Sequence, residues 1–477
     1  MLSFLLWPLQ PAKAGEVWEM VGGFGLGDPD NTVVATMETW NNAIYAGIKN
    51  ETDGARIYRS TDGNTWTKVN TDGFGHVALN TVISFEPFGN RLYASVIDDD
   101  DVPAQTAEIW STADGITWTQ SGADGLGNAN NRRFYDLAVF NNQLYVGSFN
   151  AVTGAELFTT ADGITWDKVV GDGELVKGGF GVIVNDPTNF AIWGLYSYGG
   201  WLWAGTANAN GAQVWRSVDG TTWVLYVDYA GLPWLQDSTA INHFFEYNGL
   251  LYWFGIDATL GANVAERRSA IFHVFYIGGL GDVNNIWFSM NTVISNNLVY
   301  FGTRNEVTGG ELWYTSDFQN VTQIGLDGFG NPDNFAIYAL TFKDYLYVGL
   351  STVNGLKGCE IWRRYYTGLN FVITTKKLSQ GQQGFPYSVQ LTASGGVQPL
   401  TWSIASGNLP KGLSLNSQTG EISGTPQESG EFQFTIEVQD SGKKQQKARH
   451  IYTLNIIAGA SESILSQITE LPKTGQN

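Results

Sequence analysis

The chain has 477 residues, which is enough for one large and one smaller domain. Its 45 acidic residues outnumber its 26 basic residues, and the formal net charge of −19 excludes the basic surface that nucleic-acid binding needs. No apolar run reaches the about 18 residues that span a bilayer, and the single cysteine excludes a disulfide framework within the chain.

The first 14 residues are typical of a secretory signal. Residues 2–7 form an apolar core, and Ala12-Lys13-Ala14 has the small-residue pattern of a cleavage site. The basic residues that usually precede such a core are missing. We expect residues 1–14 to be a signal peptide and the protein to be extracellular.

A β repeat fills residues 15–366. Its first phrase, Leu-Tyr-x-Gly, recurs at steps of 47 to 58 residues, with Ser95 in the glycine position of the second copy. A period near fifty with four short β segments in each period predicts the blades of a β-propeller. We therefore expect an all-β fold with a seven-bladed propeller, whose copies centre on Tyr45, Tyr93, Tyr145, Trp203, Tyr252, Tyr300 and Tyr347.

Two further phrases complete each unit. The second joins an aliphatic to an aromatic residue, as in Ile109-Trp110, and Ile271-Phe272 is its expected copy in unit five. The third, Asp-Gly-x-Thr-Trp, is intact in units one to four. It resembles the Asp-box hairpin of sialidase-like propellers, with one residue fewer between Asp and Gly. The resemblance implies a propeller and a structural turn, and it gives no ground for sialidase activity.

The N-terminal segment is expected to close the ring. Unit seven stops after Trp362 and lacks an outer strand, whereas Trp18 lies in an orphan strand, residues 16–21, before unit one. Pairing of the two segments would complete the seventh blade and remove two exposed sheet edges.

An asparagine stands at the entry to the inner strand of six blades. Inner strands line the central channel of a propeller, so these amides are expected to ring its mouth. They could bind a glycan or a hydrated ion, or each could satisfy the backbone of its own loop. The residues are Asn31, Asn80, Asn131, Asn189, Asn285 and Asn334.

Two other groups are candidate ligand residues. Trp193, Trp201, Trp234 and Trp253 lie outside the repeated phrases and could stack on a sugar. The loops on one face are rich in carboxylates, which calcium prefers as ligands, although aspartates also cap turns and no loop has EF-hand spacing. The candidate metal ligands there are Asp28, Asp98, Asp99, Asp100, Asp101, Asp124, Asp282 and Asp327.

A second domain is expected over residues 371–458. Short alternating strands separated by Gly/Pro turns predict a β-sandwich. Pro399-Leu400-Thr401-Trp402, Leu409-Pro410-Lys411-Gly412 and Gly420-Glu421-Ile422-Ser423-Gly424 follow one another in order. They resemble the Ig or dystroglycan-type cadherin-like module of bacterial surface proteins. The resemblance implies a spacer or adhesion unit, with Asp440 as a calcium ligand.

The tail, residues 459–477, carries a short targeting motif. Leu471, Pro472, Thr474 and Gly475 match the LPxTG signal of sortase substrates. The resemblance implies that a sortase cleaves after Thr474 and joins the chain to the cell wall. The apolar segment and basic tail that follow the motif in that family are absent here.

These features favour an exported surface protein that binds a glycan or a protein on its propeller, with the second domain as a spacer. The four histidines are scattered and no nucleophile elbow occurs. Paired acids for glycan hydrolysis stay open, because their pairing is spatial. The alternatives are an extracellular glycan hydrolase or lyase with its site at the channel mouth, and a structural surface-layer component. Calcium is the one cofactor considered.

Overall fold

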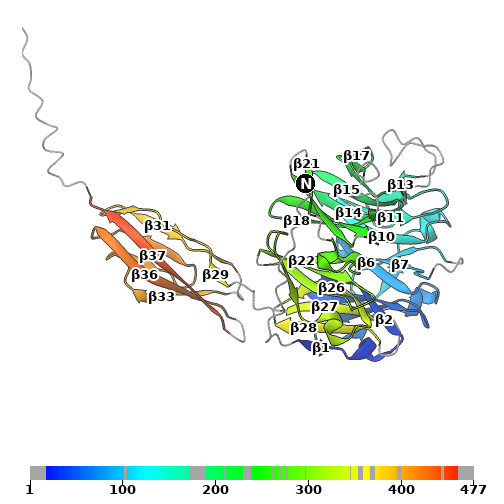
Figure 1. Ribbon diagram of the computed structural model, residues 1–477, viewed down its shortest axis with the longest axis horizontal. Coiled ribbons are helices and arrows are strands. Elements are labelled where there is room, and N and C mark those ends of the chain that lie inside the picture. Colours follow the sequence, from blue (N-terminus) through cyan, green and yellow to red (C-terminus); the bar gives the residue numbers. More distant parts are fainter. Residues whose placement is uncertain are drawn as a thin grey trace, which may run out of the picture. The chain divides into compact units, whose positions relative to one another are not determined.

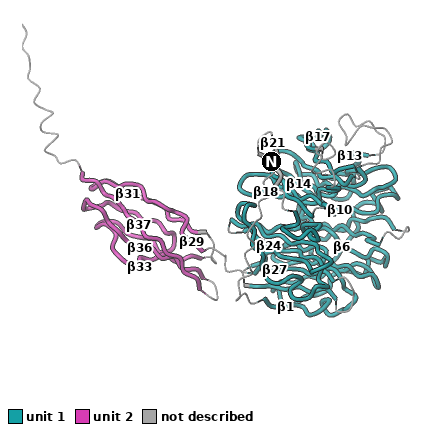
Figure 2. The backbone as a smooth tube through the Cα atoms, in the orientation of Figure 1, with its two compact units in different colours: residues 1–365 teal, residues 366–477 magenta. Residues whose placement is uncertain are grey.

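The computed structural model describes residues 18–100, 105–171, 189–208, 210–228, 238–259, 261–268, 271–275, 278–295, 297–343, 345–352, 358–365, 371–394, 399–441 and 445–459. The chain divides into two compact units, Met1–Tyr365 and Tyr366–Asn477 (Figure 2). Strands dominate both, and no α-helix occurs in the described residues. The expected signal peptide, Asp101, Trp234 and the LPxTG motif lie outside those residues.

The first unit is a propeller of seven four-stranded antiparallel blades (Figure 1). β-branched and aromatic residues favour these strands because they suit a pleated, half-buried surface. In chain order the blades are β2 (Asn31–Trp40), β3 (Ala43–Asn50), β4 (Arg56–Ser60), β5 (Thr67–Lys68); β6 (Thr81–Phe88), β7 (Arg91–Ile97), β8 (Glu108–Thr112), β9 (Trp118–Gln120); β10 (Arg133–Phe140), β11 (Gln143–Phe149), β12 (Leu157–Thr160), β13 (Asp167–Val170); β14 (Asn189–Tyr198), β15 (Trp201–Asn208), β16 (Gln213–Ser217), β17 (Trp223–Asp228); β18 (Ser238–Tyr247), β19 (Leu250–Asp257), β20 (Asn263–Arg268), β21 (Ile271–Phe275); β22 (Trp287–Ser295), β23 (Leu298–Arg304), β24 (Leu312–Thr315), β25 (Val321–Ile324); and β26 (Asn334–Phe342), β27 (Tyr345–Thr352), β28 (Glu360–Tyr365) with β1 (Glu19–Val21).

The N-terminal strand closes the ring, as predicted. β1 runs antiparallel to β28, with Met20 opposite Trp362. Trp18 packs edge-on against Phe329, with ring centroids 4.8 Å apart. Each inner strand contacts the inner strand of the next blade, and β26 contacts β2. The seven inner strands therefore surround one axis.

A turn that begins with aspartate joins the third strand to the fourth in blades one to four. Asp62 Oδ1 accepts hydrogen bonds from the backbone N–H groups of Thr65 and Asn64 at 2.7 and 2.8 Å, which hold the pKa of Asp62 far below its usual value. Gly63 follows with a φ of 71°, and a Cβ there would lie 1.8 Å from the hydroxyl of Tyr347 in the preceding blade. The same packing joins Gly115 to Tyr45, Gly163 to Tyr93 and Gly220 to Tyr145.

Blade five departs from the repeat, and one prediction there was wrong. Ile271-Phe272 begins the outermost strand, β21, while the third strand is β20. In the β18–β19 hairpin, Phe254 takes the place that the glycine of the first phrase holds elsewhere. Phe254 instead packs against Phe288 and Phe301 of blade six, at 5.0 and 5.6 Å between ring centroids. Aromatic packing thus replaces the close backbone approach that glycine permits.

Short 3₁₀ turns open five loops that lead from one blade to the next. Their second and third residues have positive φ, as for Gly125 at 58° and Leu126 at 51°. These turns set the chain direction before each inner strand. They are η1 (Phe24–Gly27), η2 (Asp72–Gly75), η3 (Asp124–Gly127), η5 (Gly278–Gly281) and η6 (Asp327–Gly330).

The second unit is an Ig-like β-sandwich. One sheet has the order β30-β37-β36-β33, another β31-β35-β34, and β29 pairs with β32. Trp402, Ile422, Phe434 and Tyr452 are buried together in its core. The strands are β29 (Val372–Ile373), β30 (Gly381–Gln382), β31 (Tyr387–Gln390), β32 (Ala393–Ser394), β33 (Thr401–Gly407), β34 (Leu413–Leu415), β35 (Glu421–Gly424), β36 (Gly430–Gln439) and β37 (Lys447–Ile457).

Candidate functional site

The predicted asparagines mostly hold the blade-to-blade loops. Asn131 is fully buried, and its Nδ2 donates to the carbonyl of Gly125 at 2.9 Å and to Glu156 at 2.6 Å. Asn31, Asn285 and Asn334 likewise donate to the glycine carbonyl six residues earlier. Because their amides are used within the loop, these contacts favour the structural interpretation over a ligand-binding ring.

Asn80 and Asn189 deviate from this pattern. In blade two, Leu79 takes the position that Asn131 holds in blade three. The carbonyl of Leu79 accepts a hydrogen bond from the Ala55 N–H, just as the carbonyl of Asn131 accepts one from the Ala107 N–H. Asn80 donates to Asp100 at 2.6 Å instead. Asn189 is partly buried and donates to Gln213 at 2.8 Å.

A second asparagine in the same blade supports the first, and sequence reasoning missed it. Asn150 Nδ2 donates to Asn131 Oδ1 at 3.1 Å, while its own Oδ1 accepts from two backbone N–H groups that follow it. Its signal in the sequence is an asparagine at the end of the second strand. Asn50, Asn208 and Asn305 make the same donation to Asn31, Asn189 and Asn285.

The described acidic candidates contact protein groups rather than converging on one point. Asp28 pairs with Arg56, and hydrogen bonding to that guanidinium lowers the pKa of Asp28. Asp99 and Asp100 pair with Lys49 at 3.4 and 2.8 Å. Each of the other described candidates accepts a hydrogen bond: Asp98 from the backbone N–H of Asp100, Asp124 from Gln120, Asp282 from Asn305, Asp327 from Gln323 and Asp440 from the backbone N–H of Gln446.

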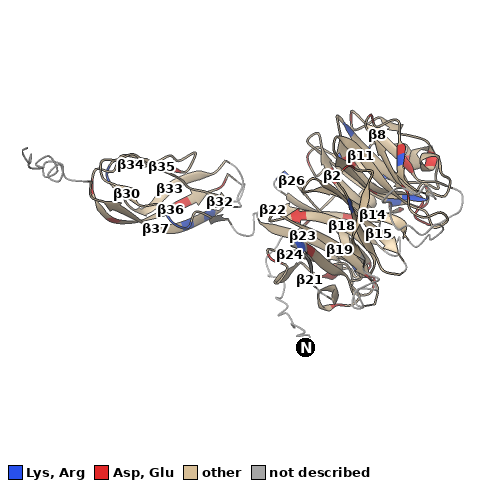
Figure 3. Ribbon diagram, turned by 90° about the horizontal axis from the view of Figure 1, so that it is seen from above, with Lys and Arg blue, Asp and Glu red and all other residues tan. Residues whose placement is uncertain are grey.

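No metal cluster supports the calcium hypothesis in the part of the chain that the structure describes. No three His, Cys, Asp or Glu side chains come together there in a group that could hold a metal ion. Charged residues are sparse along the strands of both units (Figure 3).

The candidate tryptophans occupy three different environments. Trp253 is fully buried in the core that blades four and five share. Trp201, at the start of β15, has the guanidinium of Arg216 over its ring at 4.3 Å. Trp193 lies on the inner strand β14 and is partly exposed. Of these three residues, Trp193 alone faces the propeller axis with the neighbours described next.

Aromatic side chains from three inner strands meet beside Trp193. Its indole stacks on Tyr135 of β10 with ring centroids 4.5 Å apart and 24° between planes. It also meets Trp287 of β22 edge-on at 5.3 Å. The indole Nε1 of Trp193 is buried without a hydrogen-bond partner in the described structure. Blades three, four and six thus contribute to one aromatic cluster.

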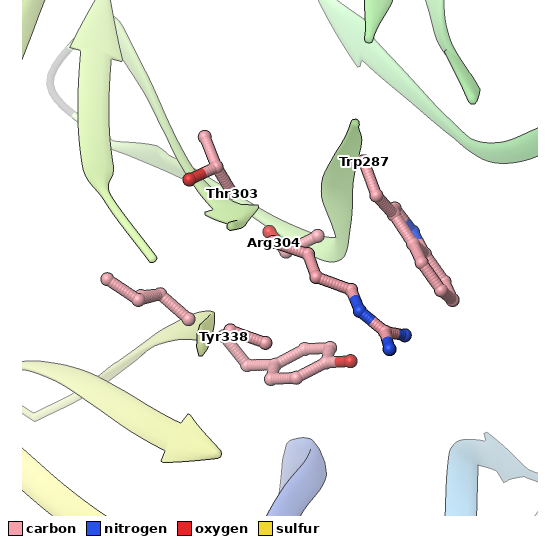
Figure 4. A pocket seen from close by; sticks show the side chains of 7 residues that line it. Trp287, Thr303, Arg304 and Tyr338 are labelled. Atoms are coloured by element: carbon pink, nitrogen blue, oxygen red, sulfur yellow. The ribbon is translucent and has the colours of Figure 1, made fainter. Parts of the chain in front are cut away.

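A small hollow adjoins Trp287 between blades six and seven, and Arg304 and Tyr338 help to line it. The Arg304 guanidinium lies over the Trp287 ring at 5.2 Å, and Figure 4 shows it between that ring and the hydroxyl of Tyr338. Burial raises the pKa of Tyr338, so its hydroxyl stays protonated and able to donate. Tyr135, Trp193, Trp287, Arg304 and Tyr338 are called the axial aromatic cluster below.

The repeat does not require the axial aromatic cluster. Tyr135 and Trp193 stand four residues after Asn131 and Asn189. The matching residues in blades one, two and five are Ala35, Ile83 and Asn242. These smaller side chains leave the ring intact. The aromatic residues are therefore additions to the architecture, which is what a binding site on a scaffold looks like.

Three carboxyl groups lie deeper along the same axis. Glu38, Glu86 and Asp136 come from the inner strands of blades one, two and three. Burial raises the pKa values of Glu38 and Asp136 to about 7. Burial, with the nearby charges of Asp136 and Glu38, also raises that of Glu86 well above its usual value.

A known protein family matches part of the chain. Residues 370–456 match the Putative Ig domain family. This is the Ig-like unit, and the match covers less than half of the chain, so it does not classify the propeller. No curated protein sequence matches the chain.

Several solved structures resemble the fold at 10% identity. The extracellular domain of the putative hybrid two component system BT3049 from B. thetaiotaomicron aligns over 94% of this chain and 58% of its own, with a TM-score of 0.47. A prolyl endopeptidase aligns over 89% and 61%, at 0.44, and Aleuria aurantia lectin over 66% and 99%, at 0.39. The chain thus spans less than two thirds of the first two. All three TM-scores lie below 0.5, so these likenesses support no conclusion about function.

One further finding concerns membranes. Among the described residues, no helix is both long enough and apolar enough to cross a bilayer.

Proposed function

We propose that this protein is an extracellular surface protein whose propeller binds a glycan at the axial aromatic cluster. The Ig-like unit serves as a spacer, and sortase attachment through Thr474 joins the chain to the cell wall. The observation that carries the binding proposal is the stacking of Tyr135, Trp193 and Trp287 at positions where the repeat needs no aromatic residue.

The chemistry of the cluster suits a sugar. The apolar C–H face of a pyranose packs on flat aromatic surfaces, and its hydroxyls need directional partners at the edge. Trp287 and Trp193 offer the surfaces, while the Tyr338 hydroxyl and the Arg304 guanidinium offer polar partners.

A glycan array tests the proposal. The whole chain should show saturable binding to a subset of glycans, and Trp193→Ala and Trp287→Ala should weaken it at least tenfold. For uncharged glycans Trp201→Ala is the matched control, because Trp201 lies on the same blade as Trp193 but outside the axial aromatic cluster. Equal binding by all four proteins, or capture of protein ligands alone, would refute a glycan site at this cluster.

The three axial carboxyl groups favour hydrolysis as the second candidate function. Carboxyl groups with raised pKa values can protonate a leaving group near neutral pH, and a glycosidase needs two acids that flank one bond. Glu38, Glu86 and Asp136 supply such groups on the inner strands of blades one to three. Release of reducing ends from a bound glycan, abolished by Glu86→Gln, would establish this activity. Binding without release of reducing ends would support the carbohydrate-binding proposal alone. If the protein neither bound nor cleaved a glycan, a structural surface-layer role would be favoured.

A further inference from the structure

The junction between blades four and five differs electrostatically from the regular junctions. At the junction of blades one and two, Arg59 Nε donates to the Tyr45 hydroxyl at 3.0 Å, and the charge of Asp114 reaches the same hydroxyl. At the junction of blades seven and one, Arg363 Nη1 donates to the Gly63 carbonyl at 3.2 Å beside Asp62. Each arginine therefore lies next to the aspartate turn of the following blade.

Arg216 is the matching arginine of blade four, directly after the aromatic residue of the second phrase and opposite Trp203. Blade five has no aspartate turn for it to meet. In its place β20 brings in Arg267, whose guanidinium lies 5.4 Å from the Trp203 ring centroid. Where the regular junctions bring an aspartate turn to the ring of the first phrase, this junction brings a second cation.

Both guanidinium groups contact the ring of Trp203. Arg216 lies 4.3 Å from the Trp201 ring centroid, 4.9 Å from that of Tyr226 and 5.5 Å from that of Trp203. Arg216 and Arg267 lie 5.5 and 5.4 Å from the Trp203 ring centroid, so their guanidinium carbons are at most about 11 Å apart. Cation–π contact offsets part of the cost of desolvating these charges, but it does not neutralise them.

Neither arginine is neutralised by protein groups that the structure describes. Their Nε atoms and the Tyr226 hydroxyl are buried without a hydrogen-bond partner. No ion pair joins either guanidinium to an acid in the described residues, although the chain carries 45 acidic residues against 26 basic ones. Two neighbouring unpaired cations in so acidic a protein repel one another, and a bound anion would relieve that repulsion.

We propose that Arg216 and Arg267 form a second binding site, for a single oxyanion group of an extracellular ligand. The aromatic ring of Trp201 covers one face of Arg216, which leaves the edge of the planar guanidinium for paired hydrogen bonds to oxygen. A carboxylate, sulfate ester or phosphate ester shares this chemistry. The site is independent of glycan binding at the axial aromatic cluster, because none of its residues belongs to that cluster.

Calorimetric titration of the whole protein tests the site with sodium sulfate, phosphate and acetate as separate probes, at constant ionic strength set with chloride. At least one probe should bind saturably, and the strongest identifies the group. Arg216→Gln and Arg267→Gln should each weaken it at least tenfold. Arg59→Gln is the matched control, because Arg59 occupies the same strand position at a junction that has its aspartate turn. Absence of saturable binding for all three probes, or equal loss in the control, would overturn the proposal.

A second measurement uses the unaltered chain, in case the variants fold poorly. Phenylglyoxal modifies accessible arginines, and mass spectrometry of the digested protein reports each site. The binding anion should slow modification of Arg216 and Arg267 while leaving Arg59 unchanged. Unchanged rates at Arg216 and Arg267 would contradict the site even if the protein bound anions elsewhere.

Discussion

Single residues connect one blade to the next. The tyrosine of the first phrase packs its hydroxyl over the glycine of the following aspartate turn, as Tyr93 does over Gly163. Both phrases were visible in the sequence, but the contact between them was not, because it joins neighbouring repeats in space. This close contact explains why each Asp-Gly turn of blades one to four follows a blade whose first phrase carries a tyrosine.

Gly163→Ala tests this packing. The Cβ would lie 1.7 Å from the Tyr93 hydroxyl at a φ of 71°, so we expect a loss of at least about 3 kcal/mol in unfolding free energy. Gly89→Ala is the matched control, because Gly89 has a φ of 60° but open space around it, and about 1 kcal/mol is expected there. Urea unfolding measures the loss of unfolding free energy in both variants. Equal losses would show that backbone conformation alone requires the turn glycine.

The axial carboxyl groups make stability depend on pH. Burial raises the pKa of Glu38 to about 7 from an ordinary value of 4.5, so between these values the folded state binds more protons than the unfolded state. Stability contributed by this group is therefore complete at low pH and falls as pH rises toward 7. Glu38→Gln should raise the melting temperature relative to the unaltered protein at pH 8, and by less at pH 5. A gap that does not change with pH would contradict the buried position of this carboxyl group.

At the scale of elements, blade regularity was predictable and its interruptions were only partly so. Strand and turn chemistry is local, which is why seven units and the β1–β28 closure could be inferred from phrases. Blade five misled the assignment of Ile271-Phe272, because its third strand has lost the aromatic residue of the second phrase and holds Ala265 opposite Trp253. The asparagine pairs also escaped notice, since each spans two loops.

Ring closure through β1 can be tested directly. Replacing residues 18–21 with a Gly/Ser segment of equal length would remove Val21, which is 2% exposed, together with the contact of Trp18 with Phe329. A loss of about 4 kcal/mol is expected, which lowers the propeller's melting temperature by roughly 5 °C. An unchanged calorimetric transition would mean that β1 does not contribute to closure.

At the scale of the whole molecule, function follows departure from the repeat. Trp193 was found from the sequence because it lies outside the consensus, whereas Tyr135, Trp287, Arg304 and Tyr338 come from other blades. Their convergence depends on the ring, and it becomes visible only when inner strands are compared position by position. The regular residues build the scaffold, and the irregular ones provide the candidate sites.

The two compact units should unfold as separate transitions. Trp402 is 4% exposed in the core of the Ig-like unit, so Trp402→Ala should cost that unit about 3–5 kcal/mol. Calorimetry of the whole chain should then show one transition at lower temperature while the propeller transition stays in place. A shift of both transitions would show that the units are energetically coupled.

Fluorine NMR of the chain labelled with 5-fluorotryptophan tests glycan binding at the axial aromatic cluster most directly. Trp193→Phe and Trp287→Phe assign two of the 18 tryptophan signals. Titration with the strongest glycan from the array should shift the Trp193 and Trp287 signals to saturation and leave Trp201 and Trp402 in place. A saturable shift of other tryptophans with Trp193 and Trp287 unmoved would contradict the account.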